Sequence, residues 1–158
     1  MARRYWLLKS EPTVFSIQDL AKAKDQTTCW EGVRNYQARN LLRDELQAGD
    51  GVIFHHSNAK PPHIAGTAVV ARAGYPDAYA WKKGHKYFDP KTDKSDPTWF
   101  MVDVKLERIF DTPLSLDFLK TVPALTNMML LQRGSRLSVQ PVTPKEWKAV
   151  LRLADKTP

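Results

Sequence analysis

The chain has 158 residues, of which 42% are hydrophobic and 26% charged, as in an ordinary globular protein, and we expect residues 1–158 to form a single domain. The single cysteine, Cys29, excludes an internal disulfide and a cysteine-based zinc site, and it fits a reducing compartment. Lys and Arg outnumber Asp and Glu by 24 to 17, for a net charge of +7, so a polyanionic partner is a natural expectation.

The sequence gives no sign of a membrane segment. No apolar run is long enough to cross a bilayer, and the run after Arg3 and Arg4 is too short for the apolar core of a signal peptide. We therefore expect no membrane partner and an intracellular protein, cytoplasmic or, in a eukaryote, nuclear.

Alternation and capping signals predict the elements of the N-terminal half. Ser16 and Asp19 form a capping box before a short helix, and Asn35 is a suitable N-cap for a second helix. The turn residues 48–51 lead into an apolar run typical of a buried strand. In chain order we expect strand 5–9, helix 16–22, strand 27–30, helix 36–46 and strand 52–56.

The C-terminal half shows the clearest alternation, over residues 99–109, which is typical of a half-buried strand. Thr143, Pro144 and Glu146 are a strong helix start, with a cap, a first-turn proline and an acidic third position. In chain order we expect strand 64–72, antiparallel to the strand before it, a helical turn at 76–81, a polar loop at 82–97, strand 99–109, helices 114–121 and 125–131, strand 137–139, and a last helix whose apolar face holds Trp147, Val150, Leu151 and Ala154.

These elements predict an α+β domain. Most strands are joined by short turns or single helices, which favours a mixed, strongly curved sheet or a small β-barrel with flanking helices. Four polar stretches, at 9–12, 30–35, 55–57 and 134–141, end or interrupt the predicted strands, where folding alone would favour apolar or plain turn residues. Their side chains are suited to line a pocket.

No evident catalytic set accompanies these stretches. The adjacent residues His55 and His56 on one strand point to opposite faces and cannot chelate a metal together, so we expect no metal site and no cofactor. Glu11 and Glu31 could serve as acid/base carboxylates, with His56 assisting, in an enzyme that acts on a base. Salt bridges to nearby arginines explain the two carboxylates about as well.

Basic and aromatic residues favour a nucleic-acid partner. Residues 81–87 interleave lysines with rings, and such a pattern attracts phosphates and stacks on unpaired bases, although a solvated loop explains it equally well. Trp30 stands out because Gly32 and polar residues follow it. Ser138 and Gln140 share one face of the last predicted strand and offer donors and acceptors to a base edge, as they would to solvent.

Together these stretches resemble the EVE domain, a member of the PUA-like superfamily. The similar motifs are 5–12, 30–40, 49–50 with 54–57, 87–91 and 134–142, in the family's order over nearly the whole chain. The resemblance implies a PUA-like barrel and a pocket for a modified base in DNA or RNA, by kinship with YTH domains that read methylated adenine. One departure is Phe-His-His-Ser at 54–57, where the family commonly has Phe-Tyr-His-Ser, which could alter the base preference.

We therefore predict a non-enzymatic reader of a modified base, in which Trp30 takes the place of a YTH cage residue. The predicted pocket residues are Ser10, Glu11, Trp30, Val33, Asn35, His56, Ser57, Ser138 and Gln140. The predicted phosphate contacts are Arg34, Arg39, Lys82, Lys83 and Arg136. A base-modifying enzyme and a basic adaptor surface without a pocket are the alternatives. The modification, the choice between DNA and RNA, and a partner nuclease or helicase stay open.

Overall fold

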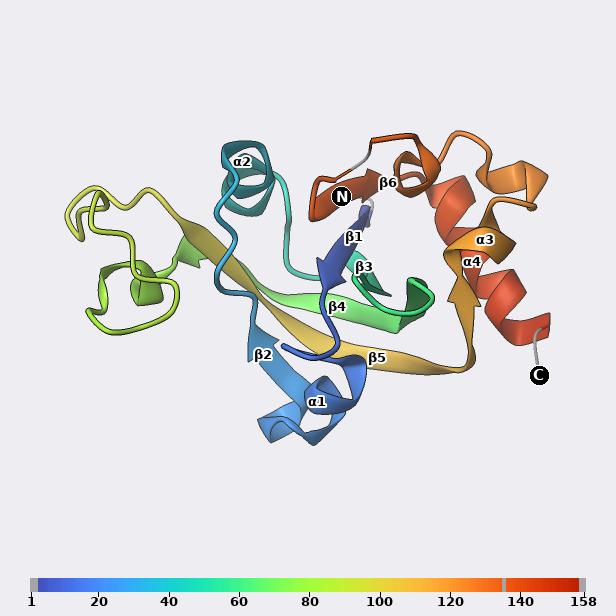
Figure 1. The fold of residues 1–158 in the computed structure, drawn as a ribbon, viewed down its shortest axis with the longest axis horizontal. Helices are drawn as coiled ribbons and strands as arrows, with labels where there is room; N and C mark the ends of the chain where they lie inside the picture. The colour runs from blue at the N-terminus through green and yellow to red at the C-terminus, as the bar shows by residue number, and fades with distance from the viewer. Residues whose placement is uncertain (1–2, 135, 157–158) are drawn as a thin grey trace.

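Six strands form one mixed β-sheet in the computed structural model, which describes residues 3–134 and 136–156 (Figure 1). The strands are β1 (Tyr5–Ser10), β2 (Thr27–Cys29), β3 (Gly51–His56), β4 (His63–Pro76), β5 (Phe100–Ser115) and β6 (Val139–Val142). Their order across the sheet is β2-β5-β4-β3-β1-β6. Strands β1 and β3 are parallel, and the other neighbours are antiparallel.

The edge strands β2 and β6 are not paired with each other in the described residues, so backbone hydrogen bonds do not close the sheet into a barrel. The ladder between the two longest strands, β4 and β5, contains several register shifts. Such irregularities bend a strand pair and increase its twist. The α+β class and the mixed sheet are confirmed, whereas barrel closure is not.

Helices and single helical turns connect the strands. The α-helices are α1 (Ile17–Lys22), α2 (Tyr36–Asp44), α3 (Leu116–Leu119) and α4 (Pro144–Lys156). The 3₁₀ turns are η1 (Lys24–Gln26), η2 (Ala78–Trp81), η3 (Pro123–Leu125) and η4 (Met129–Leu131). In residues 3–134 and 136–156, every helix is too short or too polar to span a membrane.

The predicted helix starts are confirmed at atomic detail. The Ser16 hydroxyl accepts from the Asp19 N–H (3.1 Å), and the Asp19 carboxylate accepts from the Ser16 N–H (2.8 Å), which completes the capping box of α1. The Asn35 side chain accepts from the Ala38 N–H (2.9 Å) and caps α2. At the start of α4, the Thr143 hydroxyl accepts from the Glu146 N–H, and the Glu146 carboxylate accepts from the Thr143 N–H. These starts depend on residues three positions apart, which is why sequence alone locates them.

Three predicted boundaries are wrong. The helix expected at 125–131 is two separate 3₁₀ turns, η3 and η4. Backbone N–H groups here donate to the carbonyl three residues earlier, as the Met128 N–H does to the Leu125 carbonyl. Strand β5 continues to Ser115 and leaves only one turn for α3. The last strand starts at Val139 rather than 137, because its pairing with β1 runs from Val139 to Val142.

The sheet has a hydrophobic cluster on each face, because alternate residues of a strand point to opposite sides. On β1, Leu8 belongs to the first cluster and Leu7 to the second, and both are fully buried. The first cluster includes residues of α1 and α2, and the second includes residues of α3 and α4. Figure 1 shows α3 and α4 at the right-hand end of the molecule and α2 at the top, left of the centre.

Candidate functional site

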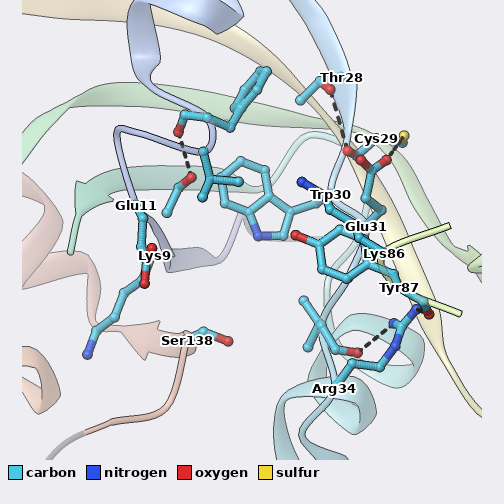
Figure 2. Close-up of a pocket in the computed structure, with 15 residues that line it drawn as sticks. Lys9, Glu11, Thr28, Cys29, Trp30, Glu31, Arg34, Lys86, Tyr87 and Ser138 are labelled. Carbon is cyan, nitrogen blue, oxygen red and sulfur yellow. Dashed lines mark hydrogen bonds between the residues drawn. The ribbon is translucent and has the colours of Figure 1, made fainter. Parts of the chain in front are cut away.

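A cavity of about 410 Å³ lies where the chain leaves β1 and β2 (Figure 2). Its volume is within the range of about 300–1,000 Å³ that holds small ligands. Segments far apart in the sequence meet there. The lining residues are Lys9, Ser10, Glu11, Val14, Phe15, Thr28, Cys29, Trp30, Glu31, Gly32, Val33, Arg34, Lys86, Tyr87 and Ser138.

Trp30 forms an aromatic wall of this cavity and is fixed in place. Its backbone N–H donates to the Val102 carbonyl (2.7 Å), which extends the pairing of β2 with β5 by one residue. The indole meets Phe15 and Phe54 edge-on, with ring centroids 6.4 and 5.4 Å apart, and only 8% of the residue is exposed. Trp30 belongs to the first core cluster and to the cavity, so its ring is already ordered before a ligand binds.

Tyr87 supplies a second aromatic side chain and reaches the cavity only because residue 32 is glycine. A Cβ at Gly32 would lie 2.3–2.5 Å from atoms of the Tyr87 ring, so the ring rests directly on the Gly32 backbone. Gly32 also has a φ of +81°, which a residue with a side chain rarely adopts. The sequence motif does not predict the contact between Gly32 and Tyr87, because the two residues are far apart in the chain.

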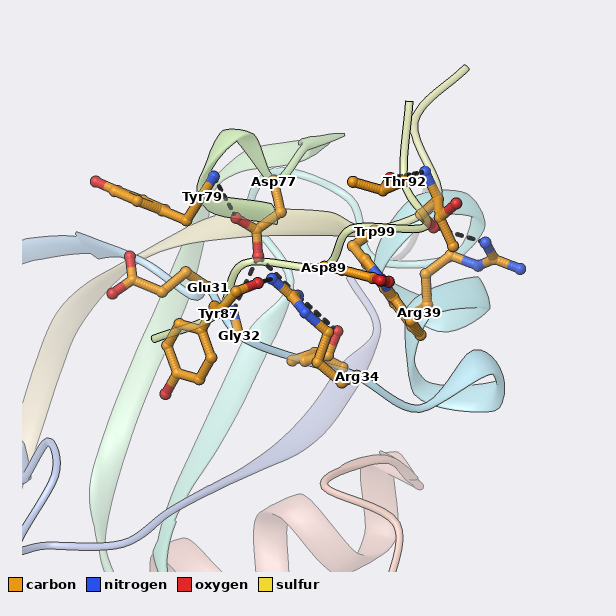
Figure 3. A network of polar contacts seen from close by, with 12 residues as sticks. Glu31, Gly32, Arg34, Arg39, Asp77, Tyr79, Tyr87, Asp89, Thr92 and Trp99 are labelled. Atoms are coloured by element: carbon orange, nitrogen blue, oxygen red, sulfur yellow. Dashed lines mark hydrogen bonds and ion pairs between the residues drawn. The ribbon is translucent and has the colours of Figure 1, made fainter. Parts of the chain in front are cut away.

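A buried carboxylate holds these pieces together (Figure 3). Asp77 is fully buried and accepts from the Gly32 N–H (2.9 Å) and from Arg34 Nη1 (3.0 Å). Arg34 Nη2 in turn donates to the Tyr87 carbonyl (2.7 Å). The Tyr79 N–H donates to the other Asp77 oxygen (3.0 Å). Arg34, predicted to contact phosphate, therefore fixes the Tyr87 loop against the chain after β2.

The polar groups near Trp30 favour recognition over covalent chemistry. The Cys29 thiol donates to Glu31 Oε2 (2.9 Å), and burial, with help from this bond, raises the pKa of Cys29 to about 12. The thiol is therefore protonated at neutral pH and is a poor nucleophile. The Ser10 hydroxyl donates to the Phe15 carbonyl (2.6 Å) and shapes the opposite rim. In the described residues, no group of three His, Cys, Asp or Glu could hold a metal ion.

The structure gathers five of the nine predicted pocket residues at this cavity: Ser10, Glu11, Trp30, Val33 and Ser138. It places the side chains of the other four elsewhere. Asn35 is engaged as the cap of α2 and lines a second cavity. Ser57 follows β3, and its N–H donates to the Ser10 carbonyl (3.0 Å), which ties β3 to β1 outside the cavity lining.

Gln140 faces the other side of the sheet. It stands opposite Leu7 in the β1–β6 pairing, and residues directly opposite each other in antiparallel strands share a face. Leu7 belongs to the second core cluster, whereas Trp30 belongs to the first. Gln140 is 1% exposed, and its amide donates to the Leu137 carbonyl (2.9 Å). The predicted pairing of Ser138 with Gln140 fails because Ser138 precedes the strand.

His56 is buried and engaged by the fold. Its Nε2 accepts from the Ile17 N–H (3.1 Å), so it anchors the first turn of α1. Its Nδ1 then donates to His63 Nε2 (2.9 Å), a tautomer set by the bond to Ile17. Both ring nitrogens are occupied, and His56 is outside the cavity lining. The acid/base set suggested for an enzyme is not assembled, although Glu11 and Glu31 do share the cavity.

The predicted phosphate contacts are spread over a wider surface. Arg136 is exposed and lines a second cavity of about 460 Å³, with Asn35, Gln37, Met129, Gln132, Arg133, Gly134 and Leu137. Arg39 donates to the Thr98 carbonyl (2.6 Å) and braces the polar loop. Lys82 and Lys83 are exposed and line neither cavity, whereas Lys86 lines the first.

The family model for the EVE domain matches residues 4–153. The chain belongs to the EVE domain family. Human thymocyte nuclear protein 1 is 42% identical over 171 residues, which covers 98% of this chain and 75% of that protein.

Solved structures of similar chains share the fold. A hypothetical protein from Leishmania major has a TM-score of 0.91 at 48% identity, covering 98% of this chain and 96% of that one. The human THYN1 protein, solved in complex with DNA containing 5-methylcytosine, has a TM-score of 0.90 at 41% identity, covering 98% of this chain and 99% of that one.

Sequence reasoning misses several residues of this EVE domain site. Asp77 and Tyr87 contact the chain after β2 from segments more than 40 residues away, a long-range packing that no local pattern predicts. A signal does exist for Tyr87, which lies in one of the family-like motifs. The sequence suggests only a catalytic role or a salt bridge for Glu31, and the structure shows it as the acceptor of a protonated thiol.

The EVE domain should lose stability as the pH falls below about 6.5, because two histidines are buried in the neutral form. Burial lowers the pKa of His56 to about 4 and that of His55 to about 3. Between those values and the unfolded value near 6.5, the unfolded chain binds more protons, which favours unfolding with a slope of up to about 1.4 kcal/mol per pH unit per histidine.

Urea denaturation at about pH 7.5 and about pH 5 measures this loss. The substitution His55→Leu provides the control, because the two ring nitrogens of His55 are buried and make no hydrogen bond in the described structure. A leucine there does not titrate, so the variant should lose part of the pH dependence. A stability that is equal at both pH values would contradict the assignment of neutral, buried histidines.

Proposed function

We propose that this EVE domain is a non-enzymatic DNA-binding module that takes a modified base into the cavity at Trp30 and Tyr87. The observation that carries the proposal is an aromatic-walled cavity of base size in a chain whose human relative was solved with DNA containing 5-methylcytosine. We further propose that residues 1–158 act as a single domain, and that the protein works in the nucleus if its source is a eukaryote. RNA is the second candidate ligand.

The aromatic walls offset the cost of extracting a base. Flipping a base out of a duplex costs a few kcal/mol, and less for a single strand. Stacking on an aromatic side chain returns about 1–3 kcal/mol per base. Because Trp30 and Tyr87 are both held by the fold before binding, little of this gain is lost to ordering the site.

The polar lining suits the edge of a cytosine. The Glu31 carboxylate already accepts the Cys29 S–H through one oxygen, and its other oxygen is suited to accept from an exocyclic amine. The buried thiol cannot compete as an anion, because its pKa is raised to about 12. We assign Ser138 and Ser10 to the opposite rim, and a base methyl group to the apolar surface of Val33.

The nucleic-acid backbone is assigned to the cationic surface beside the cavity. Arg133 and Arg136 line the second cavity. Asn35 lines the second cavity too, and the residue before it, Arg34, lines the first, so the two cavities share this segment of the chain. Lys86 is exposed and lines the first cavity. Arg39, Lys82 and Lys83 remain proposed contacts from the polar loop side. Such contacts make affinity fall steeply with salt, without reporting the base. A partner nuclease or helicase is left open.

The proposal is tested by titrating labelled oligonucleotides that carry one 5-methylcytosine or one cytosine at two salt concentrations. Tighter binding of the methylated probe at both salt concentrations supports a base reader. Equal binding of the two probes, with a collapse at high salt, would reduce the function to contact with phosphates and favour the adaptor alternative.

The substitution Gly32→Ala should remove most of this discrimination. Its methyl group would collide with the Tyr87 ring and force the ring off its seat, so we expect the affinity for methylated DNA to fall by about tenfold or more. Gly49→Ala is the matched control, since Gly49 also has a positive φ, of +94°, but only its chain neighbours lie within 4 Å of the place that the new methyl group would take. If both variants bind alike, Tyr87 is not part of the site.

A further inference from the structure

Tyr36 is an exposed aromatic side chain next to the proposed site. It is the first residue of α2 and 63% exposed, the largest value among the exposed large hydrophobic residues of the described chain. Its neighbours in sequence, Arg34 and Asn35, line the first and the second cavity respectively. Tyr36 is therefore one residue along the chain from a residue of the second cavity and two from a residue of the first.

The ring of Tyr36 is held by a rigid support. It stacks on Trp99, with centroids 5.0 Å apart and planes inclined by 30°. Trp99 itself is 5% exposed, and its indole N–H donates to the Asp89 carboxylate (2.7 Å). Tyr36 is therefore an ordered platform, and it would lose little entropy on stacking against a further ring.

A continuous series of rings and guanidinium groups links the cavity wall to Tyr36. The Arg34 guanidinium carbon lies 5.5 Å from the centre of the Tyr87 ring and 5.3 Å from that of Trp99. Arg39 continues the series, 5.2 Å from the centre of the Tyr36 ring. Figure 3 shows Tyr87, Arg34, Trp99 and Arg39 in this succession along the network.

We propose that Tyr36 is a second stacking site, which binds the base adjacent to the one held in the cavity. This inference rests on the proposed function. The chemistry fits a nucleotide, because a largely exposed ring takes a flat base while the Arg39 guanidinium, which lies over the same ring, attracts the phosphate. The series through Arg34 places this platform on the path that a strand leaving the Tyr87 wall would follow. The site then holds two consecutive bases of one strand.

Two probes separate this role from that of the cavity. One is 5-methyl-2′-deoxycytidine monophosphate, and the other is a single-stranded trinucleotide with 5-methylcytosine at its centre. Tyr36→Ala should leave the affinity for the monophosphate within about twofold, because that probe has no adjacent base, and weaken the trinucleotide by about 5- to 150-fold. Tyr36→Phe keeps the ring and should bind both probes like the original protein.

An abasic version of the trinucleotide, lacking the bases on both sides of the methylcytosine, is the matched control. With it, the original protein and Tyr36→Ala should bind alike. The proposal is overturned if Tyr36→Ala weakens both probes equally, which would make Tyr36 a support for Trp99, or if it weakens neither.

The failure of the proposed function gives a different result. If the original protein does not bind the monophosphate, yet its binding of the trinucleotide depends on Tyr36 and on the adjacent bases, the cavity assignment fails, and Tyr36 stacks on a base without a second base held in the cavity. If it binds neither probe, both proposals are overturned.

Discussion

Replacing Trp30 with alanine should weaken the binding of DNA containing 5-methylcytosine by about 5- to 150-fold, the loss of one base–aromatic stack. The same change should lower the free energy of unfolding by about 3–5 kcal/mol, since Trp30 is 8% exposed and packs against Phe15 and Phe54. The sequence predicts only the first effect. Affinity is measured by anisotropy titration, and stability by urea denaturation.

A matched tryptophan separates the two effects. Trp147 is 5% exposed and belongs to the second core cluster, on the other face of the sheet from Trp30. Trp147→Ala should cost similar stability while leaving the affinity of the folded protein unchanged. If either alanine variant fails to fold, the pair Trp30→Phe and Trp147→Phe gives the same comparison. Unchanged binding by folded Trp30→Ala would remove this residue from the site.

The sequence predicts those parts of the structure that short-range signals determine. The caps of α1 and α2 follow from Ser16, Asp19 and Asn35, each of which bonds to a backbone group three residues away. The position of Trp30, at the end of a short predicted strand and before Gly32, predicts a pocket residue, and Trp30 does line the cavity. Local geometry is encoded in neighbouring residues, so a single sequence is enough to find it.

Register and long-range contacts explain the errors. The last strand starts two residues later than predicted, so Ser138 lies before β6, at the cavity, while Gln140, opposite Leu7, faces the second core. The sequence suggests two roles for Asn35, and the cap of α2 engages its side chain. The prediction that His56 lines the pocket fails, because the bond it accepts from Ile17 depends on how α1 docks on β3. None of these outcomes follows from periodicity alone.

The contact between Asp77 and Arg34 carries the second large prediction. Asp77→Ala would leave the Arg34 guanidinium and the N–H groups of Gly32 and Tyr79 without this acceptor in a part-buried place. Removing one partner of a buried ion pair costs about 3–5 kcal/mol. We therefore expect a drop of this size in the free energy of unfolding, measured by urea denaturation.

The same variant should also bind methylated DNA more weakly. Arg34 bonds to the Tyr87 carbonyl and to Asp77 at once, so losing the carboxylate frees the Tyr87 loop from the chain after Trp30. Asp44→Ala removes a carboxylate from the exposed pair with Arg43 and should change neither stability nor binding appreciably. If Asp77→Ala loses stability but keeps its discrimination for methylcytosine, Tyr87 is held by other contacts, and the network supports the fold rather than the site. A parallel loss of stability and discrimination would mean that one buried carboxylate orders both walls of the cavity, which gives a reason for its burial.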